Sequence, residues 1–209
     1  SYNRTLDDIF SVESEVAGAI ADTLNARLSG TEKQELAAKP TSNSEAYDAY
    51  LRGLAFSERS YLLEEDAANA LQSFEKAVAL DPNFALAWAR VSKMHSVIFQ
   101  YSDASAARRD SAHAALQKAL QLEPDLLDAQ LAEGYYYYRV VHEFDRAREI
   151  LARVHSKWPN NSEAPRALAL VARRQGHWDE SLAHFDEALE LDPRNAIVRT
   201  NLDAVRQVF

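Results

Sequence analysis

Four prolines close four similar phrases in this chain, and their spacing constrains the fold more than any other feature. Three phrases read AVALDP, ALQLEP and ALELDP, and a degenerate fourth reads VHSKWP. The prolines, Pro82, Pro124, Pro159 and Pro193, lie 42, 35 and 34 residues apart. A period in the mid-thirties is typical of stacked repeats, in which each repeat packs only on its neighbours. The chain is therefore expected to present a binding surface rather than a reaction centre.

The copy from Ser162 to Pro193 indicates that each repeat is a pair of antiparallel helices. Gly176 separates two helical stretches and allows the positive φ of a tight turn. Helices that cross closely need small residues at the crossing and large residues beside them. This copy supplies both kinds, at Ala164, Leu168, Ala169, Ala172, Trp178, Leu182, Phe185, Ala188, Leu189 and Leu191.

The same small and large positions recur in the other three copies. They are Tyr47, Tyr50, Ala70, Phe74, Ala77 and Pro82 in the first, Trp88, Ser92, His95, Ala112, Leu116, Ala119 and Pro124 in the second, and Gly134, Tyr137, Ala147, Leu151 and Pro159 in the third. This pattern resembles the tetratricopeptide repeat family. The resemblance implies an all-α fold, a right-handed α-solenoid of helix-turn-helix repeats.

Three zones follow from the repeat boundaries. Residues 1–43 should form an N-terminal amphipathic helix and a short linker helix, because Val12, Val16, Ile20, Leu24 and Leu28 step by four. Residues 44–193 should hold four repeats, at 44–82, 83–124, 125–159 and 160–193. Residues 194–209 should form a C-terminal capping helix that covers the last apolar face.

Two further segments carry a wider resemblance. Residues 2–16 (YNRTLDDIFSVESEV) and 43–53 (NSEAYDAYLRG) are similar to segments of bacterial multidomain proteins. Those proteins place a TolB-like domain before tetratricopeptide repeats, and an adenylate or guanylate cyclase or a winged-helix regulator at their start. The resemblance implies a non-catalytic protein-interaction module of a bacterial signalling protein, such as an adenylate cyclase, in the cytoplasm.

The first helix of each pair should line the concave face of such a solenoid. Counted from Gly134, Tyr135, Tyr138 and Arg139 should face this groove, and Tyr137 should enter the core. Arginine forks bind carboxylates with two hydrogen bonds, and tyrosine supplies a rigid wall. The predicted partner is an acidic or carboxylate-ended peptide, or the upstream domain of the same protein. The alternative is that these cations only solvate the helix surface. The predicted groove consists of Arg52, Arg90, Lys93, Tyr135, Tyr138, Arg139, Arg166, Arg173 and Arg174.

A second hypothesis is that the chain is a scaffold for self-association. Val16, Ile20 and Leu24 on the N-terminal helix would then pair with a second copy, and the homodimer would set the oligomeric state of the upstream domain. The same helix could instead pack on the first repeat as a cap.

Composition excludes several other classes. The formal net charge of −9 argues against nucleic-acid and membrane-surface binding, since both need a basic face. The chain contains no cysteine, which removes thiolate catalysis and zinc–thiolate sites. No nucleophile elbow, phosphate loop or HExxH motif occurs. Neither catalytic residues, nor a metal, nor a cofactor are predicted.

Overall fold

The fold is entirely helical in the part of the chain that the computed structural model describes, which is residues 12, 15–16, 40–57 and 64–207. The all-α prediction is therefore confirmed. The helices are α3 (Ser44–Ser57), α4 (Glu64–Leu80), α5 (Ala85–Tyr101), α6 (Ala106–Leu122), α7 (Leu127–Tyr136) with its π-helical continuation η1 (Tyr137–Val141), α8 (Phe144–Lys157), α9 (Glu163–Gln175), α10 (Trp178–Leu191) and α11 (Ala196–Arg206).

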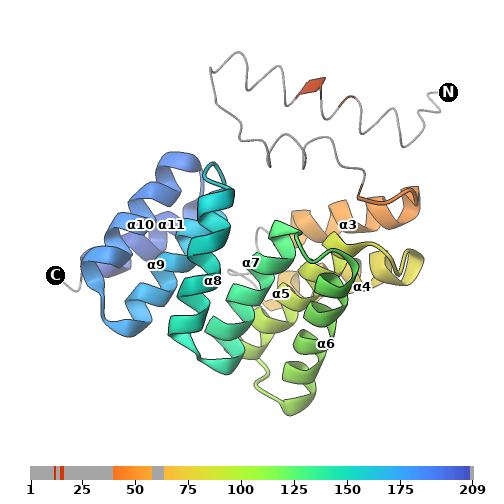
Figure 1. Cartoon of the computed structure of the whole chain (residues 1–209), viewed down its shortest axis with the longest axis horizontal. Helices are drawn as coiled ribbons and strands as arrows, with labels where there is room; N and C mark the ends of the chain where they lie inside the picture. Colours follow the sequence, from red (N-terminus) through yellow and green to blue (C-terminus); the bar gives the residue numbers. More distant parts are fainter. Residues whose placement is uncertain (1–11, 13–14, 17–39, 58–63, 208–209) are drawn as a thin grey trace.

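Successive helices pack in pairs, and the pairs stack into a curved array. The pairs are α3 with α4, α5 with α6, α7 with α8, and α9 with α10. We call the first helix of each pair its A helix and the second its B helix. Figure 1 shows the stack running in chain order from α3 and α4 at one end to α10 and α11 at the other. The last helix, α11, packs on α10 through the buried side chains of Val198, Leu202 and Val205.

Small residues lie where the A and B helices of a pair cross, as predicted for Ser92 and Gly134 but not for Gly53. A Cβ atom on Gly53 would lie 2.5 Å from Cε1 of Phe74, and one on Gly134 would lie 2.5 Å from Cδ2 of Leu151. In the second pair Ser92 takes this position, and its hydroxyl donates a 2.9 Å hydrogen bond to the carbonyl of Ala112. The facing large residues, Phe74, Leu116, Leu151 and Phe185, are all buried.

The carbonyl oxygens of the repeat prolines accept hydrogen bonds at the turns that follow the helix pairs. The side chain six residues after the proline donates a hydrogen bond to its carbonyl oxygen in three of the four turns. These donors are Trp88 Nε1 at 3.0 Å, Gln130 Nε2 at 3.2 Å and Arg199 Nη2 at 2.7 Å. The fourth position is Pro165, which has no side-chain donor. These bonds connect three of the four turns to the helix that follows each of them.

The turn inside the third pair differs from the glycine turn of the fourth. Gly176 has φ 79° as predicted, whereas the third pair turns at His142 with φ 64°, after the π-helical segment η1. Glycine adopts this left-handed conformation freely, but for other residues it costs about 1–2 kcal/mol. The π-helix and the histidine turn were not predicted, because the sequence pattern assumes regular α-helices up to a glycine.

A His142→Gly variant should therefore be more stable than the wild type. Relief of left-handed strain outweighs the roughly 0.5–1 kcal/mol entropic cost of glycine, so we expect a net gain of about 0.5–1 kcal/mol. The imidazole of His142 is exposed, and its removal opens no cavity. Urea unfolding should show a higher midpoint at an unchanged slope. The reciprocal control, Gly176→Ala, meets no atom within 4 Å of the new Cβ, yet should lose stability through its φ alone. If both variants are as stable as the wild type, the left-handed conformation costs a non-glycine residue nothing at these two turns.

Candidate interaction surface

All nine predicted groove residues lie on A helices or on η1, but they differ in exposure. Arg52 and Arg174 are exposed, and Arg90 and Arg173 are half-buried. The other five were expected to face an open groove and are instead buried: Lys93, Tyr135, Tyr138, Arg139 and Arg166. Tyr137, expected in the core, is only half-buried and stacks on Arg146 of α8, with the guanidinium carbon 3.9 Å from the ring centre. Contact of these residues with a partner stays a prediction.

The burial of the cations has a physical reason, because the array brings carboxylates onto the same face. Glu163, the first residue of α9, is paired through both oxygens of its carboxylate. Arg166 Nη2 donates to Oε2 at 3.0 Å, Arg166 Nε lies 2.9 Å from Oε1, and Lys93 of α5 donates from Nζ to Oε2. Arg166 Nη2 also donates to the hydroxyl of Tyr135 on α7 at 2.8 Å. We call Lys93, Tyr135, Glu163 and Arg166 the Glu163 cluster.

The ring of Tyr135 lies at the centre of this charge arrangement. Lys93 Nζ is 5.0 Å from the ring centroid, and the guanidinium carbons of Arg139 and Arg166 are 5.1 and 5.7 Å away. The faces of an aromatic ring attract cations, most strongly where water is excluded. Arg139 also donates from Nη1 to Oε1 of Gln100 on α5. One tyrosine therefore stabilises cations from three successive repeats.

A second ion pair joins neighbouring A helices. Arg90 Nη2 on α5 donates to Oδ1 of Asp128 on α7 at 2.6 Å, beside the buried ring of Tyr50. Burial acts to lower the pKa of Arg90, but Asp128 and then Tyr50 act against it, and the net direction is upward. Burial raises the pKa of Tyr50, with Arg90 opposing. Both shifts favour a charged Arg90 and a neutral Tyr50 at physiological pH.

The Glu163 carboxylate is held in its ionised form. Burial alone would raise the pKa of Glu163, but Arg166 and then Lys93 favour the anion more strongly, and the pKa lies well below its usual range. The arginines and the lysine of the A-helix face therefore pair with carboxylates of the chain itself.

The acidic partners of these cations were missed in the sequence. Asp128 lies 38 residues from Arg90, and Glu163 lies 70 residues from Lys93, so no local pattern joins them. A signal was nevertheless present, because Asp128 and Glu163 each lie four residues after a repeat proline. Equivalent positions in successive A helices meet on one face of the array.

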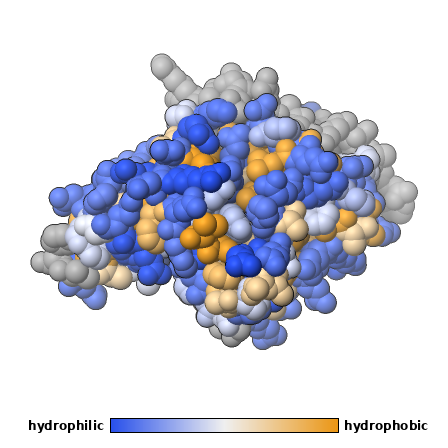
Figure 2. Space-filling model, turned by 60° about the horizontal axis from the view of Figure 1, so that its bottom comes forward, coloured by the Kyte–Doolittle hydropathy of each residue, from blue (hydrophilic) through white to orange (hydrophobic). Residues whose placement is uncertain are grey.

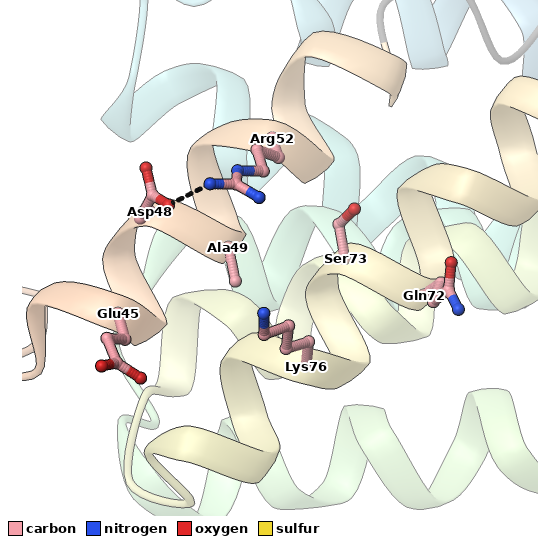
Figure 3. Close-up of a pocket in the computed structure, with 7 residues that line it drawn as sticks. All are labelled: Glu45, Asp48, Ala49, Arg52, Gln72, Ser73 and Lys76. Carbon is pink, nitrogen blue, oxygen red and sulfur yellow. Dashed lines mark hydrogen bonds and ion pairs between the residues drawn. The ribbon is translucent and has the colours of Figure 1, made fainter.

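A surface hollow of about 480 Å³ lies between α3 and α4 (Figure 3). Charged side chains line most of it, and Arg52 pairs there with Asp48 at 2.6 Å. In the second pair the positions equivalent to Glu45, Asp48 and Arg52 carry the buried apolar residues Phe84, Ala87 and Val91, which pack against the first pair. The hollow thus lies on a polar face of the first described helix pair, and Arg52 lies on this face. Its lining is Glu45, Asp48, Ala49, Arg52, Gln72, Ser73 and Lys76.

The remaining predicted features are only partly described. Val16, predicted for self-association, is 52% exposed, and Val12 one turn before it is 39% exposed. Ile20 and Leu24 lie outside the described residues, as does most of the N-terminal zone. In the view of Figure 2, hydrophobic residues form separate patches on a mostly hydrophilic surface.

The described ranges contain neither a metal-binding cluster nor a membrane-spanning helix. No three His, Cys, Asp or Glu side chains converge there as they would around a metal ion. The contacts of Glu187 with His155 at 3.0 Å and with His184 at 3.4 Å are ion-pair contacts between side chains and do not form such a site. None of the helices described here has the length and apolar character to cross a bilayer.

Comparison with known proteins identifies the repeats. Residues 59–84 and 166–195 match models of the tetratricopeptide repeat family. A curated relative, putative adenylate cyclase 3 of Rhizobium meliloti (strain 1021), is 26% identical over 142 residues, or 66% of this chain. The chain covers only 22% of that relative's length.

A solved structure shares the fold. The crystal structure of a thermophilic protein with the same repeats, from Thermus thermophilus, superposes with a TM-score of 0.56 at 20% identity, covering 93% of this chain and 99% of that one. A crystal structure of MamA is 25% identical with a TM-score of 0.44, covering 78% of this chain and 86% of its own.

Proposed function

Because this chain is an array of tetratricopeptide repeats, we propose that it is a non-catalytic protein-interaction module that docks a peptide segment or a neighbouring domain against its A helices. The observation that carries the proposal is the stack of helix pairs, in which side chains from α5, α7 and α9 converge on one face. The proposal takes residues 44–193 as four repeats and residues 194–209 as their cap. Repeat arrays of this type offer extended surfaces and are used for binding.

An acidic partner fits this face. Arg90, Lys93 and Arg166 already hold two carboxylates of the chain itself, and their geometry is the one that arginine and lysine use for carboxylates in other molecules. At the end of α9, Arg174 is exposed, and the half-buried Arg173 donates from Nη1 to Oδ1 of Asn201 at 2.9 Å. The proposed partner therefore carries acidic side chains that meet the A-helix face beside α9.

The relative suggests a setting for this module. The matched region of the putative adenylate cyclase is a minor part of that protein. We place this chain in a bacterial signalling protein of the same kind, in the cytoplasm, with an upstream cyclase or regulator domain as one candidate partner.

Charge reversal on α9 tests the docking face. We expect Arg173→Glu with Arg174→Glu to abolish capture of the partner by the immobilised chain, because an acidic segment would be repelled. The probes are the source-cell extract and, separately, the purified upstream domain. The control is Arg148→Glu with Arg153→Glu on the B helix α8, a reversal of the same two charges at exposed positions. Capture that survives the α9 reversal, or is lost equally in the control, would contradict the proposed face.

Self-association is a second candidate, favoured by the exposure of Val12 and Val16 one helical turn apart. If the chain is a scaffold for self-association, the average mass measured by light scattering should rise with concentration from that of a monomer towards that of a dimer. Val16→Asp should then shift the equilibrium to the monomer. A wild-type monomer at every concentration removes this candidate and leaves the docking function unaffected.

A further inference from the structure

The Glu163 cluster joins two helix pairs that are not neighbours. In a solenoid each repeat usually contacts only the next one, so stability is a sum of local terms. Here Lys93 belongs to α5 in the second pair, and Glu163 belongs to α9 in the fourth. The third pair contributes Tyr135 from α7, which accepts from Arg166 and lies under Lys93. Three A helices are therefore tied together at one point.

The Glu163 cluster is shielded from solvent. The side chains of Lys93 and Arg166 are 10% and 4% exposed, and that of Glu163 is 25% exposed. Water and salt screen a buried pair much less than a surface pair. Removal of one partner leaves the other charges with a large desolvation penalty, so the cluster resists opening.

The Glu163 cluster also constrains the bend of the array. Lys93 and Glu163 touch only if α5 and α9 approach each other across α7, so their contact constrains the bend of the array over three pairs. The pair Arg90–Asp128 differs in this respect, because it joins α5 only to the adjacent α7. It adds stability between neighbours without constraining the bend over three pairs.

We propose that the Lys93–Glu163–Arg166 contact is a lock that holds the second to fourth helix pairs at one curvature and makes them unfold as one cooperative unit. The lock keeps the spacing of α5, α7 and α9 fixed before any partner arrives. A partner that docks on this face then meets a preformed surface and does not have to bend the array, which lowers the cost of binding. The lock does not depend on the proposed docking function, since it concerns the chain alone.

The test compares variants of the two ion pairs in the intact chain. Glu163→Gln and Lys93→Met remove the lock, and Asp128→Asn is the matched control in the neighbouring pair. We expect the urea slope to fall by roughly a quarter to a third in the lock variants, because the slope scales with the surface exposed in the main transition and the C-terminal helices unfold separately. Small-angle scattering should give a larger radius of gyration for the lock variants. The control should lower the midpoint with slope and radius unchanged.

Two results would overturn the proposal. One is an unchanged slope and radius in the lock variants. The other is the same change in the Asp128→Asn control as in the lock variants. If the variants fail to fold, native-state hydrogen exchange of the wild type tests the lock instead. The lock requires amides of α9 and α10 to exchange with the same opening free energy as those of α5. Protection that falls step by step from α5 to α10 would show that the pairs open independently.

Discussion

Replacement of Gly134 by leucine is expected to lower the free energy of unfolding by about 1–3 kcal/mol. The α7 backbone passes so close to α8 that even a Cβ atom would lie 2.5 Å from Leu151 Cδ2 and 2.7 Å from its Cγ. Leu151 is itself fully buried, so its side chain cannot swing out into solvent. The two helices must therefore separate, and contacts along the whole third pair are lost. Urea unfolding followed by circular dichroism measures the effect.

A second substitution separates overpacking from a general loss of helix stability. Leu151→Ala removes the atoms that the new side chain meets, so the double variant should be more stable than the sum of the two single effects predicts. Residues in direct contact show such coupling, at about 0.5–3 kcal/mol. Additive effects would mean that Gly134 and Leu151 do not share one space, and the assigned crossing would be wrong.

Replacement of Glu163 by leucine should cost more, about 3–5 kcal/mol at pH 7. The variant keeps the volume of the side chain but leaves Lys93 and Arg166 without the carboxylate that they share. Breaking a buried ion pair on one side is costly because the remaining charges stay desolvated. Glu149→Leu on the exposed face of α8 is the control and should change stability little. A loss for Glu163→Leu no larger than for this control would show that the cluster contributes no stability.

The stability contributed by Glu163 should depend on pH with a defined sign. The folded-state pKa of Glu163 lies below its unfolded value near 4.5, so its contribution is fully present above that value and decreases as the pH falls through the folded pKa. The difference between wild type and Glu163→Leu should be constant from pH 7 to about pH 5 and shrink in stronger acid. A difference that grows on acidification would contradict the assigned pairing.

The fold could be predicted because its determinants recur within each repeat. Gly134 and Leu151 lie 17 residues apart. A small residue on the A helix and a large one on the B helix recur in the other repeats. Such short-range patterns report the packing of one helix pair. Their repetition then predicts the stack, because an isolated pair leaves an apolar face uncovered.

The burial and pairing of the charged side chains on the A-helix face could not be predicted in the same way. Arg90 and Lys93 were placed on the correct helices, but their acidic partners come from later pairs, 38 and 70 residues away. Whether those side chains meet depends on the bend of the whole array. The bend is a tertiary property that a single repeat does not encode. The burial of Tyr135 has the same origin, since cations from three repeats surround its ring.

Hydrogen exchange of the chain with and without its captured partner shows whether the A helices form the docking face. If a protein segment docks on the A helices, peptides from α5, α7 and α9 should gain protection on binding, while peptides from α4, α6 and α8 should not change. Protection confined to the B helices, or no protection at all under saturating partner, would contradict the account.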